Sequence, residues 1–193
     1  MSQIVDPQQV VGTKDGFDYD RLITEFGMEY ISQELIHRIE SVTGKSVNHM
    51  IRRGLIFAHV DLNKIIDAYE QHLPIYIYTG RGPSAPHLHL GHIVPLLLTK
   101  HLQELFNALV IIQISDDEKL YYKHDLNEED VEFNTHENIK DIIALGFDPK
   151  LTYIFQNSKN IGMLYPMSQY ILPIQQILLK RKLEGRFLVQ KSI

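Results

Sequence analysis

Residues 75–92 read IYIYTGRGPSAPHLHLGH, and this stretch decides the predicted fold. Its first four residues, 75–78, are β-rich, and a glycine turn over residues 79–83 follows directly. Apolar residues then recur at helical spacing over residues 90–106. Pro95 falls in the first turns of that helix, where a missing N–H group is tolerated. The stretch therefore predicts a strand, a tight turn and a long helix.

The same pattern repeats further along the chain. Residues 109–114 form a nearly continuous apolar run, of the kind that is buried on both faces of a parallel sheet. We expect a helix over residues 127–145 and a further strand over residues 152–155. This alternation indicates right-handed βαβ units, and hence an α/β fold with a parallel sheet and flanking helices. A last helix is expected over residues 167–183, with a break at Pro173.

The part of the chain before this alternation predicts a small helical N-terminal region. Polar caps and glycines mark the ends of its short helices. The expected boundaries are Asp18 or Asp20 to Gly27, Ser32 to Gly44, Ser46 to Gly54, and Asp61 to residue 70. We therefore expect one region over residues 1–73 and a second over residues 74–193.

The composition is that of an ordinary soluble globular protein, with 193 residues, 44% of them hydrophobic and 22% charged. Because there is no cysteine, a disulfide framework, a thiolate zinc site and a cysteine nucleophile are excluded. No stretch approaches the roughly 18 apolar residues of a membrane span, and we see no secretory signal at the start. A net charge of -5 argues against a general basic coat for nucleic acid. We expect a cytoplasmic protein that has no membrane partner.

The start of the helix near residue 90 predicts a nucleotide site. Ligands bind beyond the carboxyl ends of the strands in an open parallel sheet, and a helix N-terminus offers N–H groups to phosphate. Gly91 has no side chain, so a flat base can approach the backbone. His89 and His92 are three residues apart and share one face of the first turn. Three roles stay open for them: phosphate binding, a structural helix start, or a metal site with His87, although no nearby carboxylate completes a ligand set.

The end of the second predicted strand carries further polar residues. Gln113 is the one polar residue of the run over residues 109–114. It either faces a ligand or is a buried amide bonded to a neighbouring helix. Asp116, Asp117 and Glu118 either serve a ligand or form an acidic first helical turn, which the helix dipole favours. Both pairs of alternatives stay open on the residues alone.

Longer blocks of the sequence resemble a known family. His89-Leu90-Gly91-His92 resembles the first signature, HIGH, of class I aminoacyl-tRNA synthetases. Seven blocks look like tryptophanyl-tRNA synthetase of the eukaryotic and archaeal type: VDPQQV, GFDYDRLITEFG, LIHRIESVTG, IRRGLIFAHVDLNKIIDAYE, YIYTGRGPS, LVIIQISDDEK and IIALGFDP. The resemblance runs from about residue 5 to about residue 163 without an evident gap. It implies a partial Rossmann-like parallel sheet, with residues 74–193 as the first part of the nucleotide-binding catalytic domain.

The resemblance also implies roles for single residues. The ATP-binding group is Thr79, Gly80, Arg81, Gly82, His89, Gly91 and His92, with His89 and His92 as the catalytic residues. The tryptophan-binding group is Tyr78, Gln113, Glu118 and Lys119. Tyr78 and Gln113 match the pair that recognises the indole N–H group, so we expect a buried phenol oxygen and an amide oxygen there. The implied cofactors are ATP and Mg²⁺, and no metal site made by the protein is implied.

The implied activity is that of a tryptophan–tRNA ligase. Such an enzyme forms tryptophanyl-adenylate from ATP and tryptophan and then charges tRNA(Trp). The implied partners are tRNA(Trp), tryptophan and a second copy of the chain in a homodimer; an unpaired sheet edge would also favour self-association. Two alternatives remain: a tryptophan- and ATP-binding module without catalysis, and a tyrosyl-tRNA synthetase, which the helical leader and the context of Gln113 disfavour.

The sequence departs from the family pattern in three places. Residues 85–87 replace a stretch that in the family usually carries Ser, Glu and small or apolar residues. The match fades after residue 163. No KMSKS-like second signature is evident, and neither are the second half of the sheet and the anticodon-binding domain. We expect a fragment or a truncated gene product that forms adenylate far more slowly than a complete enzyme does.

Overall fold

A computed structural model describes residues 4–5, 10–11, 18–122 and 126–183. The chain divides into two compact units: unit 1 combines Met1–Ile77 with Val94–Val110, and unit 2 combines Tyr78–Ile93 with Ile111–Ile193. Each unit therefore joins segments that are distant in sequence. Every helix of the described residues is too short or too polar to span a bilayer.

The N-terminal part of unit 1 is mostly helical. Its elements are β1 (Ile4–Val5), β2 (Val10–Val11), α1 (Tyr19–Phe26), β3 (Glu29–Tyr30), α2 (Gln33–Thr43), α3 (His49–Arg52), β4 (Ala58–His59) and α4 (Leu62–Glu70). The two-residue strands form two antiparallel pairs, β1 with β2 and β3 with β4. The sequence did not predict these strands, because two residues carry no alternating pattern.

Local capping explains where the first two helices begin and end. The Asp18 side chain accepts a hydrogen bond from the Arg21 N–H group at 3.0 Å, and the Ser32 side chain accepts one from the Leu35 N–H group at 3.2 Å. Gly44 ends α2 with a φ of 67°, a left-handed conformation that glycine adopts without strain. These predicted caps are confirmed.

Two predicted caps in unit 1 were wrong. Ser46 does not begin α3; the Asn48 side chain caps it instead, accepting a hydrogen bond from the Met50 N–H group at 2.8 Å. Asp61 precedes α4 as expected but makes no side-chain cap, because its backbone is left-handed, with a φ of 58°. The Leu62 N–H group bonds instead to Nδ1 of His59, at 3.3 Å.

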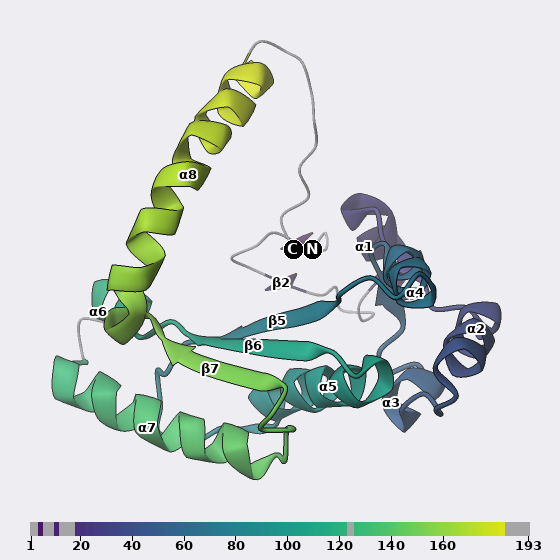
Figure 1. The fold of residues 1–193 in the computed structure, drawn as a ribbon, viewed down its shortest axis with the longest axis horizontal. Helices are drawn as coiled ribbons and strands as arrows, with labels where there is room; N and C mark the ends of the chain where they lie inside the picture. Colours follow the sequence, from purple (N-terminus) through teal and green to yellow (C-terminus); the bar gives the residue numbers. More distant parts are fainter. Residues whose placement is uncertain (1–3, 6–9, 12–17, 123–125, 184–193) are drawn as a thin grey trace. The chain divides into compact units, whose positions relative to one another are not determined.

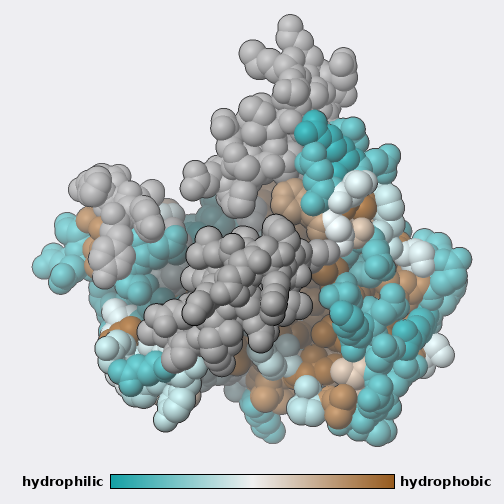
Figure 2. All heavy atoms as spheres, turned by 90° about the horizontal axis from the view of Figure 1, so that it is seen from above, coloured by the Kyte–Doolittle hydropathy of each residue, from teal (hydrophilic) through white to brown (hydrophobic). Residues whose placement is uncertain are grey.

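One apolar cluster forms the core of unit 1. Its buried members are Leu35, Ile36, Ile39, Val47, Ile51, Ile66, Leu105, Phe106 and Ala108. They come from α2, α3, α4, the end of α5 (Leu90–Phe106) and, for Val47 and Ala108, the segments before α3 and after α5, so residues far apart in sequence share this core. On the right of Figure 2, hydrophilic side chains cover much of the surface over the helices of unit 1, with hydrophobic residues between them.

The sheet predicted from residue 75 onward is present. Its strands are β5 (Tyr76–Arg81), β6 (Leu109–Ile114) and β7 (Thr152–Gln156), in the order β5-β6-β7. The strands are parallel, and the helices between them are α5, α6 (Asp116–Tyr122) and α7 (Glu128–Ala144) (Figure 1). The bounds of α5 and β6 agree with the prediction. The three strands therefore end at one edge of the sheet, which is where the sequence placed the site.

Three boundaries in this part differ from the prediction. Residues 79–81 extend β5 instead of opening a turn, and the Ser115 N–H group donates to the Arg81 carbonyl at 2.9 Å. Helix α8 (Asn157–Leu183) begins directly after β7, ten residues earlier than expected, and continues through Pro173. Its early start has a tertiary cause, because Asp116 Oδ1 accepts a hydrogen bond from the Ser158 N–H group at 3.1 Å.

Candidate functional site

Arg81 ends β5 as a buried guanidinium, with 8% of its surface exposed. Its Nε donates to Asn138 Oδ1 at 2.6 Å, and its Nη1 lies 2.9 Å from His92 Nε2. Its Nη2 is buried and finds no hydrogen-bond partner among the described residues. Burial lowers the pKa of Arg81. Because buried polar groups in proteins are normally paired, this nitrogen indicates a place for an anionic ligand.

Asn138 holds the loop that follows Arg81. It is fully buried in α7, and its Nδ2 donates to the carbonyl groups of Ala85 at 2.7 Å, Pro86 at 3.1 Å and Asn134 at 2.8 Å. Ala85 and Pro86, two of the three unusual residues 85–87, are therefore held through their backbone carbonyl groups, whatever their side chains are. Sequence reasoning missed Asn138, because nothing in its helical context marks it as different from other polar helix residues.

The His89 ring caps the first turn of α5. Its Nδ1 accepts a hydrogen bond from the Gly91 N–H group at 3.2 Å. A Cβ atom at position 91 would lie 3.1 Å from Cε1 and 3.2 Å from Nδ1 of this ring, so the missing side chain of Gly91 makes room for the imidazole. Of the three roles that the sequence left open for His89, the structure shows the structural one: the ring caps the start of α5. In the neutral ring the proton then lies on Nε2, which stays a donor.

His92 stacks on His89 and faces Arg81. The two ring centroids are 3.6 Å apart, with an interplanar angle of 29°. A guanidinium can only donate, so Nε2 of His92 is the acceptor in its contact with Arg81. Burial, and then the charges of Arg81 and His89, lower the pKa of His92. His92 is therefore neutral at neutral pH in this arrangement.

Tyr78 and Gln113 meet at the sheet, as the resemblance implied. The Tyr78 hydroxyl donates a hydrogen bond to Gln113 Oε1, and Gln113 Nε2 donates to Asn157 Oδ1 at 2.7 Å. Gln113 is thus bonded to a neighbouring helix, as one alternative stated, and its oxygen is turned towards Tyr78; the alternative that it faces a ligand stays a prediction. The expectation of a buried phenol was wrong: Tyr78 is 56% exposed, because it lies on a strand face that no described element covers.

The other predicted site residues lie on the same sheet edge or next to it. Thr79 and Gly80 are in β5, and Gly82 follows its last residue. Glu118 is exposed in the first turn of α6, and its N–H group donates to Asp117 Oδ1 at 2.9 Å. Lys119 belongs to the same helix, and its side chain is outside the described residues. The acidic first turn predicted as one alternative is present at the start of α6.

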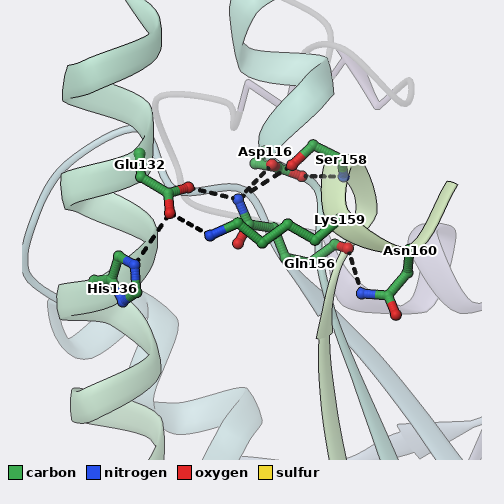
Figure 3. Close-up of polar contacts among 7 residues, drawn as sticks. All are labelled: Asp116, Glu132, His136, Gln156, Ser158, Lys159 and Asn160. Carbon is green, nitrogen blue, oxygen red and sulfur yellow. Dashed lines mark hydrogen bonds and ion pairs between the residues drawn. The ribbon is translucent and has the colours of Figure 1, made fainter.

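A polar network that the sequence did not predict lies beside this edge (Figure 3). Asp116 is 3% exposed and accepts from Gln156 Nε2 at 2.8 Å. Burial acts to raise its pKa, but hydrogen bonds from Ser158 and Gln156 outweigh it, so the pKa of Asp116 lies below its usual value. The same Gln156 Nε2 lies 2.8 Å from Glu132 Oε2. Bonds from Lys159 and Gln156 lower the pKa of Glu132 to about 2.

This network borders a groove of about 930 Å³ in unit 2. The residues that line the groove are Asp116, Leu120, Glu128, Glu129, Val131, Glu132, Phe133, His136, Glu137, Lys140, Gln156 and Ser158. Of the residues that the sequence singled out, Asp116 lines this groove; none of the ATP- and tryptophan-binding residues that the resemblance implied, and whose side chains the structure describes, lines it. The residues that the resemblance implied therefore lie at the ends of β5 and β6 and at the starts of α5 and α6, outside this groove.

The first strand of a parallel sheet thus leads through a buried arginine to a helix whose first turn holds two stacked histidines, and strands and helices alternate, which defines an α/β protein. A family model described as "tRNA synthetases class I (W and Y)" matches residues 70–174, more than half of the chain. The chain therefore belongs to this family of class I tRNA synthetases.

The curated relatives of the chain include proteins named tryptophan–tRNA ligase. A cytoplasmic tryptophan–tRNA ligase of Schizosaccharomyces pombe is 47% identical over 165 residues, which cover 83% of this chain and 42% of that protein. The cytoplasmic enzyme of Mus musculus is 46% identical over 184 residues, covering 95% and 38%. The chain thus spans about two fifths of the length of these relatives.

Solved structures agree with the family assignment. Tryptophanyl-tRNA synthetase from Trypanosoma brucei has a TM-score of 0.76 at 44% identity and covers 91% of this chain and 53% of that one. The enzyme from Plasmodium falciparum has a TM-score of 0.74 at 47% identity, with 78% and 42% covered. The predicted α/β fold is therefore confirmed.

Proposed function

We propose that this chain is the ATP- and tryptophan-binding part of a tryptophan–tRNA ligase, which forms tryptophanyl-adenylate and charges tRNA(Trp). The names of its relatives support the choice of amino acid. The observation that carries the proposal is Arg81, a buried guanidinium whose Nη2 finds no partner in the described part of the chain. It ends a strand of a parallel sheet, at the edge where ligands bind.

The proposed reaction is the attack of the tryptophan carboxylate on the α-phosphorus of ATP. A new bond forms between a carboxylate oxygen and the α-phosphorus, and the bond from the α-phosphorus to the bridging oxygen of pyrophosphate breaks, so pyrophosphate leaves with the electron pair. Because the substrate supplies the nucleophile, no protein base is needed. Arg81, His89 and His92 hold the phosphates and stabilise the charge that develops on them.

In the proposed function, Mg²⁺ is bound by ATP and not by a metal site of the protein. Within the described residues, no group of three or more His, Asp or Glu side chains is arranged to hold a metal ion. Mg²⁺ commonly binds through substrate phosphates and water and not in an all-protein site. We therefore assign the ion to the phosphates of ATP.

The amino-acid end of the proposed site lies at Tyr78 and Gln113. An indole has one N–H donor and no acceptor, so two oxygens that accept hydrogen bonds suit it. Glu118 would pair with the ammonium group of tryptophan, and Lys119 with its carboxylate.

The proposal extends to partners and location. Its partners are tRNA(Trp) and a second copy of the chain, and its location is the cytoplasm, a word in the names of the relatives. Exposed apolar side chains on α8, among them Ile161, Met163 and Ile171, support self-association.

Calorimetric titration of the chain tests the binding part of the proposal. The chain is expected to bind ATP and tryptophan, with Arg81→Gln weakening ATP alone and Tyr78→Phe weakening tryptophan alone. Arg53→Gln, an exposed arginine in unit 1, is the matched control and should change neither affinity. Absence of heat with both ligands would overturn the proposal.

Exchange of pyrophosphate into ATP tests the reaction. Exchange that requires tryptophan supports the proposal. Exchange supported by tyrosine overturns the choice of amino acid, and binding of both substrates without any exchange overturns the catalytic part for this chain.

A further inference from the structure

We infer that Asp117 and Asn157 set the amide orientation of Gln113 and thereby leave only hydrogen-bond acceptors facing the indole nitrogen. The inference rests on the proposed function and names two positioning residues that select its amino acid. Asn157 was not among the residues that the sequence singled out, and Asp117 was one only as part of the acidic run over residues 116–118; the resemblance gave neither residue a role.

The four side chains form a continuous series of hydrogen bonds. Asn157 Nδ2 donates to Asp117 Oδ1 at 3.0 Å, and Gln113 Nε2 donates to Asn157 Oδ1 at 2.7 Å. The Tyr78 hydroxyl then donates to Gln113 Oε1. Gln113, Asp117 and Asn157 are partly buried, so leaving an amide atom of this series unpaired would carry a desolvation cost.

The direction of the series follows from the carboxylate at its end. An ionised carboxylate only accepts hydrogen bonds, so the nitrogen of the Asn157 amide must face Asp117. The Asn157 oxygen is then turned towards Gln113 and requires the Gln113 nitrogen opposite it. The Gln113 oxygen is consequently turned towards Tyr78. The carboxylate itself is held in place, because Asp117 Oδ1 also accepts from the Glu118 N–H group at 2.9 Å.

This orientation has a consequence for the ligand. The proton of the Tyr78 hydroxyl is committed to Gln113, which leaves the lone pairs of the phenol and one lone pair of the Gln113 oxygen available. An arriving N–H donor therefore meets acceptors only. A ring of the same shape without the donor leaves these acceptors unpaired, which a site built for a hydrogen bond rejects strongly.

Removing the anchor should weaken that selection. Without the Asp117 carboxylate, the Asn157 amide can rotate by half a turn, and the Gln113 amide can follow it. The site then presents the Gln113 nitrogen for part of the time, and that nitrogen repels an indole N–H group. The affinity for tryptophan falls, whereas the affinity for a ring without the donor does not.

Two variants and one swap test the series. Asp117→Asn removes the carboxylate, and Asn157→Leu removes the amide and keeps the same branching of the side chain. The double variant Asp117→Asn with Asn157→Asp exchanges the two groups: the new amide nitrogen faces the new carboxylate, which still accepts from Gln113. The matched control is Glu129→Gln, which removes one exposed negative charge from the first turn of α7.

The measured quantity is a ratio of dissociation constants: that of the analogue in which sulfur replaces the indole nitrogen, divided by that of tryptophan. The unsubstituted chain and Glu129→Gln should favour tryptophan. Each single variant should lower the ratio by about tenfold to a hundredfold, the range expected for one lost buried hydrogen bond, with the analogue unchanged. The swap should restore the ratio. Equal weakening of both ligands, or an unchanged ratio in the single variants, would overturn the inference.

A measurement without ligand separates this inference from the proposed function. The side-chain amide resonances of Gln113, assigned by their loss in Gln113→Leu, should shift in both single variants and stay in place in Glu129→Gln. If the unsubstituted chain binds neither ligand, the proposed function fails, and unshifted Gln113 resonances overturn the orientation by themselves.

Discussion

Asn138 Oδ1 accepts a hydrogen bond from Nε of Arg81 at 2.6 Å. Nδ2 of the same amide donates to the Ala85 carbonyl at 2.7 Å. One fully buried carboxamide in α7 thus fixes both the guanidinium and the loop that follows it. The direction in which Arg81 presents its free Nη2 therefore depends on a helix that begins 47 residues further along the chain, since α7 starts at Glu128.

Asn138→Leu should lower the stability of the chain and its affinity for ATP together. The leucine leaves Arg81 Nε and the loop carbonyl groups unpaired, which costs about 1–3 kcal/mol for a buried group. Urea denaturation measures the first effect, and titration with ATP the second. Asn138→Asp keeps an acceptor for Arg81 and loses the donor, so it should retain more of the ATP affinity. Unchanged ATP affinity in the leucine variant would contradict this role.

We expect the imidazole of His92 to take up a proton when ATP binds. Burial and neighbouring cations lower the pKa of its imidazole in the free chain. A phosphate beside the ring favours the charged form and raises that pKa, so near pH 6 the bound state holds more protons than the free state. Titration with ATP in buffers of different ionisation enthalpy measures the uptake. His92→Gln should reduce it, and the same uptake in both chains would rule out His92 as its source.

Glu132 should stabilise the fold above about pH 4.5 and lose this effect towards pH 2. Its pKa in the folded chain is about 2, whereas its usual value is 4.5, so protons bind more tightly to the unfolded chain. Because 40% of the side chain is exposed, solvent limits the effect to about 1 kcal/mol or less. Glu132→Gln should therefore be less stable at pH 7 and equal to the unsubstituted chain near pH 2, by urea denaturation. Glu129→Gln should show no such trend.

Gly91→Ala should displace the His89 ring. The added Cβ would lie 3.1 Å from Cε1 of the imidazole, so the ring must give by a few tenths of an ångström, which weakens its bond to the Gly91 N–H group. We expect shifted His89 and His92 imidazole resonances and a weaker affinity for ATP. Gly162→Ala in α8 is the control, because a Cβ there meets nothing within 4 Å. It should leave the resonances in place and stabilise the helix by up to about 1 kcal/mol.

Features with a local cause were predicted well from the sequence. The bounds of α5 and β6 followed from the helical repeat and from the apolar run of residues 109–114. The start of α2 followed from Ser32, which caps a helix three residues away. The predicted side-chain cap at Asp61 was wrong. The residue type alone suggested this cap, but Asp61 has a left-handed φ, and its side chain makes no cap hydrogen bond to α4.

The amino-acid sequence by itself determined that a strand, a histidine-bearing helix and a second apolar strand follow one another, because hydrophobic repeats and helix caps act within a few residues. Only the tertiary structure decided which side chains meet. Tyr78 reaches Gln113 across 35 positions, Arg81 reaches Asn138 across 57, and Asp116 caps the helix that begins beside Ser158 across 42. Parallel strands bring such distant residues to one edge of a sheet, and no local pattern records that pairing.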